Sequence, residues 1–417
     1  MIKNFPDKIW DYESNVFNRL SHKDIEECIM TPAEQRFLSG SVRYLKPKRI
    51  LELGVCGGGG SVILLNAISD LPQTKLYSID ILQNHPEKAD KLIGFCAKEK
   101  FPNCKQWELY TGKEPSEIIE ELCKDGLFDF VVIDTMHIHP VETLNFITIL
   151  PYLTDDAYVY VHDLALYAIN TDFRRNSNYK PLGGFPNINI APKLLFDCVV
   201  ADKYVLPWSA YAECGQKVGS DRNTFTPESW NIVYSNAGIL QISNDTRKYV
   251  SDMFSCLEIP WALIPLGITS IQNSIKKNYS KALYNKFRNA LLGNIVLINS
   301  KYTTFDLQSN ILQLTKFENI VLYGCGKNLK ACMKDPLNVC NLADEVWDKN
   351  ADHIYDFEDT SFLHGIELKM PDLSLSTEQK KTVAVIITTV SKDLKKEMKS
   401  ELVSRGYLNI FEVQDLD

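Results

Sequence analysis

This 417-residue chain has no excess of positive charge. It contains 45 Lys and Arg residues against 53 Asp and Glu residues, which gives a formal net charge of −8. A surface built throughout for nucleic acid or anionic membrane needs the opposite sign. The chain also lacks an apolar run long enough to span a bilayer, and its first residues, MIKNFPDKIWDYES, have no signal-peptide core. We therefore predict a cytoplasmic protein with no membrane span and no nucleic-acid partner.

Paired cysteines are also missing. The 11 cysteines are odd in number and scattered, and no two form a CxxC pair. This pattern argues against a disulfide framework and against a thiolate zinc site. We expect buried or idle thiols in a reducing compartment.

Apolar residues make up 45% of the chain and charged residues 24%, which are ordinary globular values. The length predicts two or three domains. A helix start is marked by Thr31 as N-cap, Pro32 in the first turn and Glu34 in position to close a capping box.

From residue 49 onwards, short β-branched runs alternate with stretches of helical spacing. Strand–helix alternation of this kind predicts an α/β fold with a parallel sheet and helices on both faces. The predicted strands are 49–54, 75–80, 105–112, 128–134 and 157–163, with late strands in 230–243.

The rhythm breaks twice after this point. Residues 164–230 are rich in Asn, Pro and Gly, as in binding loops or disordered segments. A mostly helical stretch then leads to a second strand–helix alternation that starts at residue 317. We predict a domain over 1–245, a helical connector over 246–316 and a small α/β domain over 317–417.

The most conspicuous motif is ELGVCGGGGS, in which a strand ends at Gly54 and four glycines lead into a helix. Glycine lets a ligand approach the backbone, and the helix that follows offers free N–H groups. Asp80 ends the next strand, near the spacing of an acid that binds ribose hydroxyls. These features favour an adenosine-containing cofactor, although a tight strand–helix turn alone also requires glycine.

Glu52 stands two residues before Gly54, where an acid suits a positively charged ligand better than a pyrophosphate. With YSID, YTGKEP, FDFVVIDTMH and AYVYVHDL on successive strands, the sequence resembles the class I S-adenosylmethionine-dependent methyltransferases over about residues 30–165. The nearest group is the small-molecule O-methyltransferase branch, which includes cephalosporin-hydroxylase-like and sugar- or macrolide-modifying enzymes. The resemblance implies a Rossmann-like, mostly parallel, seven-stranded sheet.

The resemblance also implies which residues hold S-adenosylmethionine. The glycine loop and its strand would line the methionine end, Asp80 would bind the ribose, and the next strand ends would meet the adenine and the methyl group. The implied cofactor-binding residues are Glu52, Gly54, Val55, Gly58, Asp80, Ile81, Thr111, Gly112 and Asp134. Because Gly60 intervenes before Ser61, we assign no role to Ser61.

Acids and histidines gather at the ends of two neighbouring predicted strands, with Asp134 and His137 after one and His162 and Asp163 at the other. In enzymes similar to this one, carboxylates at the positions of Asp134 and Asp163 hold Mg²⁺, which would acidify a substrate hydroxyl. In a metal-free alternative, His137 or His162 is the general base. We expect His139 to serve in capping or packing.

Arg174, Arg175 and Tyr179 lie in the insertion after Asp163. Arginine pairs suit phosphate or carboxylate recognition, so these residues are candidates for substrate binding. An exposed loop that is merely basic explains them equally well.

A second glycine turn, YGCGKN, places Gly324 and Gly326 after a strand, and Asp348 ends the next strand. It resembles the small Rossmann-like domain attached to some bacterial polysaccharide-biosynthesis proteins. The ligand of this domain stays open, and a structural role or a role in forming a homo-oligomer is an alternative.

Together these patterns predict methyl transfer from S-adenosylmethionine to an oxygen of a small polar acceptor, such as a sugar or nucleotide-sugar in carbohydrate biosynthesis. A rival interpretation is an NAD-dependent nucleotide-sugar oxidoreductase or epimerase. The non-enzymatic interpretation is a binding protein on a methyltransferase fold.

Overall fold

The computed structural model describes residues 2–3, 5, 8–165, 190–214, 236–299, 311–334, 338–352, 354, 360–363, 366–372 and 374–413. The chain divides into two units, Met1–Pro265 and Leu266–Asp417. The division falls inside the predicted connector, because α12 (Asn244–Lys248) and α13 (Val250–Cys256) belong to the first unit. Helices α14 (Ile268–Asn278) and α15 (Lys281–Asn299) belong to the second.

The described part of the first unit is built on an eight-stranded sheet with the order β1-β7-β8-β6-β5-β2-β3-β4. Antiparallel pairing is limited to β8 with β6 and with β7 among these strands, and the other neighbours are parallel. The strands are β1 (Ile2–Lys3), β2 (Arg49–Leu53), β3 (Lys75–Asp80), β4 (Trp107–Thr111), β5 (Phe128–Ile133), β6 (Leu153–His162), β7 (Asp202–Val205) and β8 (Ala237–Gln241).

This arrangement confirms the predicted α/β class and its mostly parallel, seven-stranded sheet, to which the two residues of β1 add an edge. Strand β7 was not predicted, since its four half-buried residues lie inside the stretch interpreted as an irregular insertion. Strand β6 starts four residues earlier than predicted, at Leu153, because its first part includes the exposed Asp155 and Asp156, which carry no apolar signal and lie where its register with β5 shifts.

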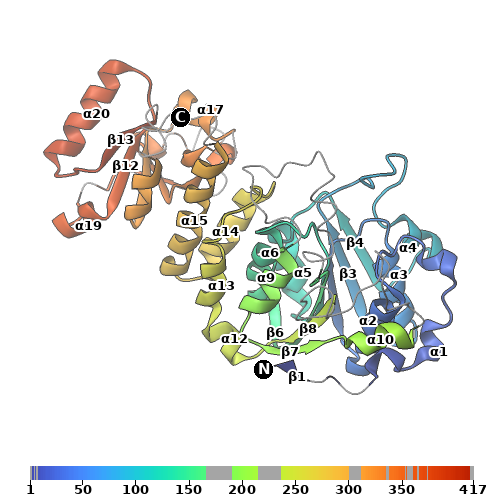
Figure 1. Ribbon diagram of the computed structural model, residues 1–417. Helices are drawn as coiled ribbons and strands as arrows, with labels where there is room; N and C mark the ends of the chain where they lie inside the picture. Colours follow the sequence, from blue (N-terminus) through green and yellow to red (C-terminus); the bar gives the residue numbers. More distant parts are fainter. Residues whose placement is uncertain are drawn as a thin grey trace. The chain divides into compact units, whose positions relative to one another are not determined.

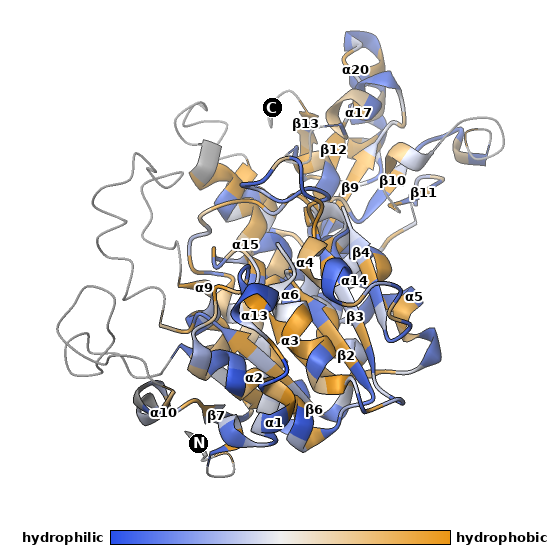
Figure 2. Ribbon diagram, turned by 90° about the vertical axis from the view of Figure 1, so that its right-hand side faces the viewer, coloured by the Kyte–Doolittle hydropathy of each residue, from blue (hydrophilic) through white to orange (hydrophobic). Residues whose placement is uncertain are grey.

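Helices cover both faces of this sheet (Figure 1). One face carries α2 (Pro32–Leu45), α3 (Gly59–Ile68) and α4 (Phe95–Lys100), and the other carries α5 (Pro115–Leu122), α6 (Val141–Ile149) and α9 (Ala191–Cys198). Helix α3 is hydrophobic on all sides and nearly all of its residues are buried (Figure 2). A helix that is apolar on all sides belongs in the core. The glycine loop is therefore held between the buried strand β2 and the buried helix α3.

Helix α2 begins as predicted, with the backbone N–H of Thr31 donating to Glu34 Oε2 at 2.7 Å and Pro32 in the first turn. The expectation that the cysteines are all idle thiols is wrong for two of them. Cys198 at the end of α9 and Cys256 at the end of α13 form a disulfide. The two positions are 58 residues apart, so only the packing of the two helices brings them together.

The second unit contains a five-stranded sheet that is parallel throughout, with the order β11-β10-β9-β12-β13. Its strands are β9 (Asn319–Tyr323), β10 (Glu345–Trp347), β11 (Glu367–Lys369), β12 (Val383–Ile387) and β13 (Ile410–Glu412). Helix α17 (Lys327–Cys332) follows β9, and α20 (Lys392–Ser404) connects β12 to β13. A smaller Rossmann-like domain is therefore present, as predicted. Among the helices of the described residues, none is both long and apolar enough to cross a membrane.

Candidate functional site

The carboxyl ends of four parallel strands bring most of the predicted site residues to one edge of the first sheet. Gly54 follows β2, Asp80 ends β3, Asp134 follows β5 and His162 ends β6. The N–H of Gly54 donates to the carbonyl of Ile79, and that of Asp134 to the carbonyl of Leu53, at 3.0 Å each. Ligands in open α/β sheets bind at this edge.

The glycine loop is shaped by close packing as well as by backbone conformation. Gly54 has φ of +87°, and a Cβ there would lie 1.9 Å from the carbonyl oxygen of Asp134. Other glycines of the loop lie against protein atoms too, since a Cβ at Gly58 or Gly59 would come within 3.0 Å of Gly94 or Cys28. The sequence left two explanations open, approach of a ligand and a tight turn, and these close contacts show that several of the glycines are needed for the fold itself.

The side chain of Glu52, on strand β2, is buried and is not part of the exposed surface of the glycine loop. Its Oε2 accepts hydrogen bonds from the hydroxyls of Ser61 and Ser78, each at 2.6 Å. Burial raises the pKa of Glu52 to about 7. Ser61, which the sequence left without a role, therefore holds the carboxyl group that belongs to the motif.

Asp80 ties the glycine loop to the end of β3. Its Oδ2 accepts from the N–H groups of Val55 and Cys56 at 2.9 and 3.0 Å, and its Oδ1 accepts from Leu82 at 2.8 Å. Thr111 pairs with Asp80 across the strands, and Gly112 donates its N–H to the carbonyl of Leu82. The structure thus brings together the loop, Asp80, the half-buried Ile81 and the end of β4, as the sequence predicted for a nucleoside.

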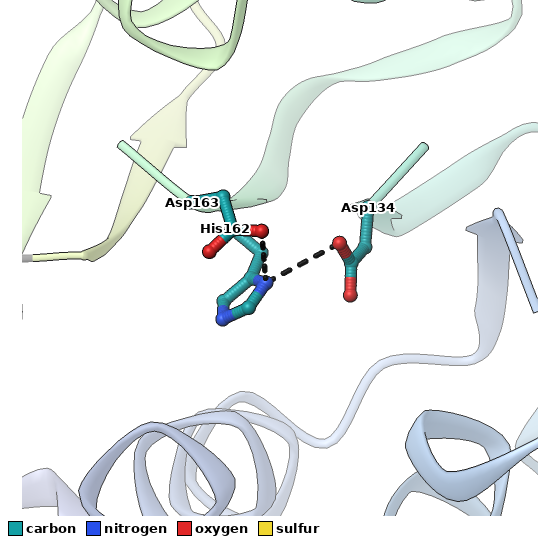
Figure 3. A group of neighbouring side chains, drawn as sticks. All are labelled: Asp134, His162 and Asp163. Carbon is teal, nitrogen blue, oxygen red and sulfur yellow. Dashed lines mark hydrogen bonds and ion pairs between the residues drawn. The ribbon is translucent and has the colours of Figure 1, made fainter. Parts of the chain in front are cut away.

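The predicted acids and histidines form one cluster beside the loop. Figure 3 shows His162 Nδ1 between two carboxylates, 3.2 Å from Asp134 Oδ1 and 3.5 Å from Asp163 Oδ2. The other ring nitrogen, Nε2, lies 3.2 Å from Oε2 of Glu34 at the start of α2. Both nitrogens of this buried imidazole therefore face carboxylates.

The imidazolium of His162 and the carboxylates of Glu34 and Asp134 stabilise one another's charged forms. Burial opposes the charge on His162, but Asp163 and Asp134 outweigh burial and hold the pKa of His162 well above its usual value. Burial likewise favours neutral Glu34 and Asp134, yet His162 lowers the pKa of both. In this state His162 is an imidazolium with no free lone pair, so it could act as a general base or bind a metal ion only after losing a proton.

His137 approaches the same carboxylates from the loop after β5. Its Nε2 lies 3.1 Å from Asp163 Oδ2 and 3.6 Å from Asp134 Oδ1, and its side chain is 19% exposed. The residue has φ of +60°, and its N–H donates to the buried Glu142 at 2.5 Å. His139 is fully buried, with Nε2 3.2 Å from the carbonyl of Ile259, and burial lowers its pKa to about 4.

Three residues of the site had no functional signal in the sequence. Glu34 was interpreted only as a helix-capping residue, but it also accepts from Tyr211 Oη at 2.8 Å. Asn236 donates to Asp163 Oδ1 at 2.9 Å. Because Tyr211 and Asn236 reach the site from distant parts of the chain, no local pattern could identify them. The predicted substrate-binding residues Arg174, Arg175 and Tyr179 lie outside the described residues.

Asp134, His162 and Asp163 also form a donor set that fits a divalent cation. One ligand atom from each lies within 4.8 Å of the others. The contact of His162 Nε2 with Glu34 is the outer-shell carboxylate contact that orients an imidazole ligand, and it turns Nδ1 towards Asp134 and Asp163. A set with an imidazole suits transition metals such as Mn²⁺ or Fe²⁺ as well as the predicted Mg²⁺.

Comparison with known proteins gives a family match for the central part of the first unit, residues 51–164, with the family described as "Methyltransferase domain". No curated protein matches the chain. Among solved structures, the O-methyltransferase TomG from Streptomyces achromogenes, in complex with S-adenosylmethionine (SAM), is similar at 16% identity. The match covers 58% of this chain and 92% of that one, with a TM-score of 0.35.

An O-methyltransferase from Bacillus cereus in complex with S-adenosylhomocysteine (SAH) matches at 16% identity, over 58% of this chain and 92% of that one, with a TM-score of 0.34. The MycE methyltransferase of the mycinamycin pathway, solved with Mg, SAH and mycinamycin VI, matches at 15% identity over 57% and 55%, with a TM-score of 0.30. The family match carries the assignment: residues 51–164 lie in a methyltransferase domain, which confirms the predicted enzyme class, an S-adenosylmethionine-dependent methyltransferase.

Proposed function

We propose that the first unit transfers a methyl group from S-adenosylmethionine to an oxygen of a small polar acceptor. The observation that carries this proposal is the position of the Asp134–His162–Asp163 cluster, which lies on the same sheet edge as the glycine loop and Asp80. A cofactor on the loop and an acceptor over the cluster would therefore be neighbours. Methyl transfer needs mainly alignment of nucleophile, methyl and sulfur, so this proximity supplies much of the catalysis.

The cofactor residues fit the group that the family match implies. Asp80 uses three of about four carboxylate lone pairs on backbone N–H groups, which leaves an acceptor for a ribose hydroxyl. Val55 and Gly58 fix the loop, while Ile81, Thr111 and Gly112 surround the end of β3. Gly54 and Asp134 meet at the strand ends, where the methionine end would lie. Glu52 accepts hydrogen bonds from Ser61, in the first turn of α3, and from Ser78 on β3, and so links the elements on either side of the loop.

His137 is the group that takes the acceptor's proton in this proposal. Its side chain is 19% exposed against 3% for His162, although carboxylates lie near both ring nitrogens of His137 as well, with Asp163 Oδ2 3.1 Å from Nε2 and Glu142 Oε1 3.8 Å from Nδ1. Asp163 lies 3.1 Å from His137 Nε2 and stabilises the imidazolium that forms when the proton arrives. Glu142 and Thr135 position the loop that carries His137.

A divalent cation would be held by Asp134, Asp163 and His162. When bound it supplies Lewis acidity that lowers the pKa of a coordinated hydroxyl. Asn236 orients Asp163 and Glu34 orients His162 for this purpose. Arg174, Arg175 and Tyr179 lie outside the described residues, and we keep them as a proposal for recognition of an anionic group such as the phosphate of a nucleotide-sugar.

Calorimetric titration of the full chain with SAH and, separately, with NAD⁺ tests the cofactor. We expect SAH to bind and Asp80→Asn to weaken it by about tenfold or more, because a charge-assisted hydrogen bond to the ribose is lost. Asp129→Asn is the matched control, since Asp129 also accepts two backbone N–H groups, from Lys48 and Arg49, but at the opposite edge of the sheet. Binding of NAD⁺ alone would overturn the proposal.

Turnover with labelled S-adenosylmethionine and a panel of sugars and nucleotide-sugars tests the reaction. We expect label in an O-methylated product, with His137→Gln lowering kcat and leaving the affinity for SAH unchanged. Cofactor binding without turnover on any acceptor would instead support a non-catalytic binding protein.

A further inference from the structure

A cleft of about 400 Å³ opens at the carboxyl edge of the second sheet. It is lined by the loops after β9, β10 and β12 and by one face of α20. The strand order is β11-β10-β9-β12-β13. The chain passes from β9 to β10 and β11 on one side and from β12 to β13 on the other, so the strand order reverses between β9 and β12. The cleft lies at this topological switch point, where ligands bind in open α/β sheets. We propose that it binds a ribonucleoside diphosphate, either as a free nucleotide or as part of a larger one.

The first argument is the bare backbone at Gly326. This residue is exposed, and a Cβ built on it meets no protein atom within 4 Å. Its φ of −97° and ψ of −174° are open to any residue, so neither conformation nor packing explains the glycine. Gly324, two residues earlier, has φ of +108° and makes the turn. In G-x-G turns the second glycine admits a pyrophosphate against the backbone, and the open space at Gly326 meets that need.

The second argument is Asp348, which follows β10 and lines the same cleft. Its Oδ2 accepts from the N–H of Cys325 at 2.7 Å, and its Oδ1 accepts from Asn350 at 2.8 Å. Asp80 in the first unit has the same arrangement, with one oxygen on the glycine loop and the other on a residue two positions later. Asp348 thus stands at the end of the second strand, where an acid binds ribose hydroxyls, with lone pairs remaining.

The third argument is apolar surface left open to water inside the cleft. Val390 and Leu394 line it and are 64% and 51% exposed. Binding sites of small molecules combine such apolar walls with a few placed polar groups. These side chains offer apolar contact to a base or to the group attached beyond the phosphates, and the exposed Lys327, which also lines the cleft, adds positive charge.

One position departs from the complete dinucleotide fingerprint. Leu329 stands where the third glycine of G-x-G-x-x-G is found, and it is fully buried. That glycine serves the packing of helix on strand rather than contact with the ligand. The departure therefore leaves both predicted contacts, the ribose at Asp348 and the diphosphate at Gly326, in place.

Calorimetry on the full chain with ADP, NAD⁺ and UDP-glucose tests the proposal. We expect at least one of these nucleotides to bind with a 1:1 stoichiometry, and Gly326→Val to weaken that binding by about tenfold or more. The valine fits the backbone conformation and the open space, so the thermal unfolding midpoint should fall only slightly, by the amount that a poorer N-cap of the short helix α17 costs. A preference for NAD⁺ over UDP-glucose would identify a dinucleotide, and the reverse a nucleotide-sugar.

Two further variants locate the binding. Gly293→Ala is the matched control, because Gly293 in α15 of the same unit also has no atom within 4 Å of a Cβ but lies away from the cleft. Asp80→Asn distinguishes this binding from binding of an adenine nucleotide at the proposed cofactor site of the first unit. Binding that survives Gly293→Ala and Asp80→Asn and falls in Gly326→Val supports the proposal. Binding that is indifferent to Gly326→Val, or no binding of all three nucleotides, overturns it.

Discussion

Glu34 Oε2 lies 3.2 Å from His162 Nε2, although 128 positions separate the two residues in the sequence. The same carboxylate accepts the N–H of Thr31 at 2.7 Å and so begins helix α2. One buried side chain therefore fixes the end of a helix and the orientation of an imidazole in the candidate site. The start of α2 and the end of β6 are coupled through it.

Glu34→Gln should lower the free energy of unfolding by about 3 kcal/mol, because it leaves the buried His162 without one of its counter-charges. Glutamine still accepts the N–H of Thr31, so the capping box itself survives. Chemical denaturation at pH 7 measures the effect.

Glu117→Gln is the matched control for that substitution. Glu117 closes the capping box of α5 by accepting the N–H of Glu114 at 2.8 Å, and it is exposed. We expect a clearly smaller loss of stability there. Equal losses in the two variants would show that capping, and not the pairing with His162, accounts for the role of Glu34.

Glu52 predicts a pH dependence of stability. Burial raises its pKa from 4.5 to about 7, so between these values the folded chain binds more protons than the unfolded chain. The stability contributed by protonated Glu52 is complete below about pH 4.5 and is lost as the pH rises through about 7.

Glu52→Gln should remove this loss. At about 1.4 kcal/mol per pKa unit, the variant should exceed the wild type by roughly 3 kcal/mol near pH 8 and match it near pH 4.5. Denaturant unfolding at several pH values measures the difference. Glu108→Gln, on the edge strand β4, is the matched control. A gain that does not depend on pH would contradict the assignment.

The fold was predictable because its signals are local. The apolar runs that became β2, β3 and β5 alternate with helical spacing, and the Thr31–Glu34 capping box marks the start of α2. Strand β7 had no such signal, since its four residues are half-buried and polar positions alternate with apolar ones only briefly. Its place is set by pairing with β8, a contact between segments distant in sequence.

The site was predictable where it depends on strand ends and not where it depends on tertiary partners. Asp134 and Asp163 follow buried strands, so their proximity can be predicted from parallel pairing alone. Two partners of the cluster, Glu34 for His162 and Asn236 for Asp163, come from the first turn of α2 and from the residue before β8. For the same reason, the packing of the glycine loop against Cys28 and Gly94 could not be foreseen.

Removing divalent ions should lower turnover far more than the affinity for SAH, since of the three proposed ligands only Asp134 also has a proposed role at the cofactor. Because the set contains an imidazole, we expect Mn²⁺ to restore turnover at lower concentration than Mg²⁺. Assays after dialysis against a chelator, with each metal added back, measure this. Asp163→Asn should respond to neither metal, and Asp129→Asn should respond as the wild type does. Full turnover in the metal-free enzyme would rule out the metal.

The disulfide between Cys198 and Cys256 should contribute to stability through the unfolded chain. It closes a loop with a sequence separation of 58, for which the chain-entropy model gives roughly 4 kcal/mol. Reductant should therefore lower the unfolding midpoint of the wild type. The variant Cys198→Ser should unfold at that lower midpoint from the outset, and reductant should have no further effect on it. Thermal unfolding with and without reductant compares the two. If reductant lowers both midpoints equally, other parts of the chain are responsible, because the variant cannot form this bond.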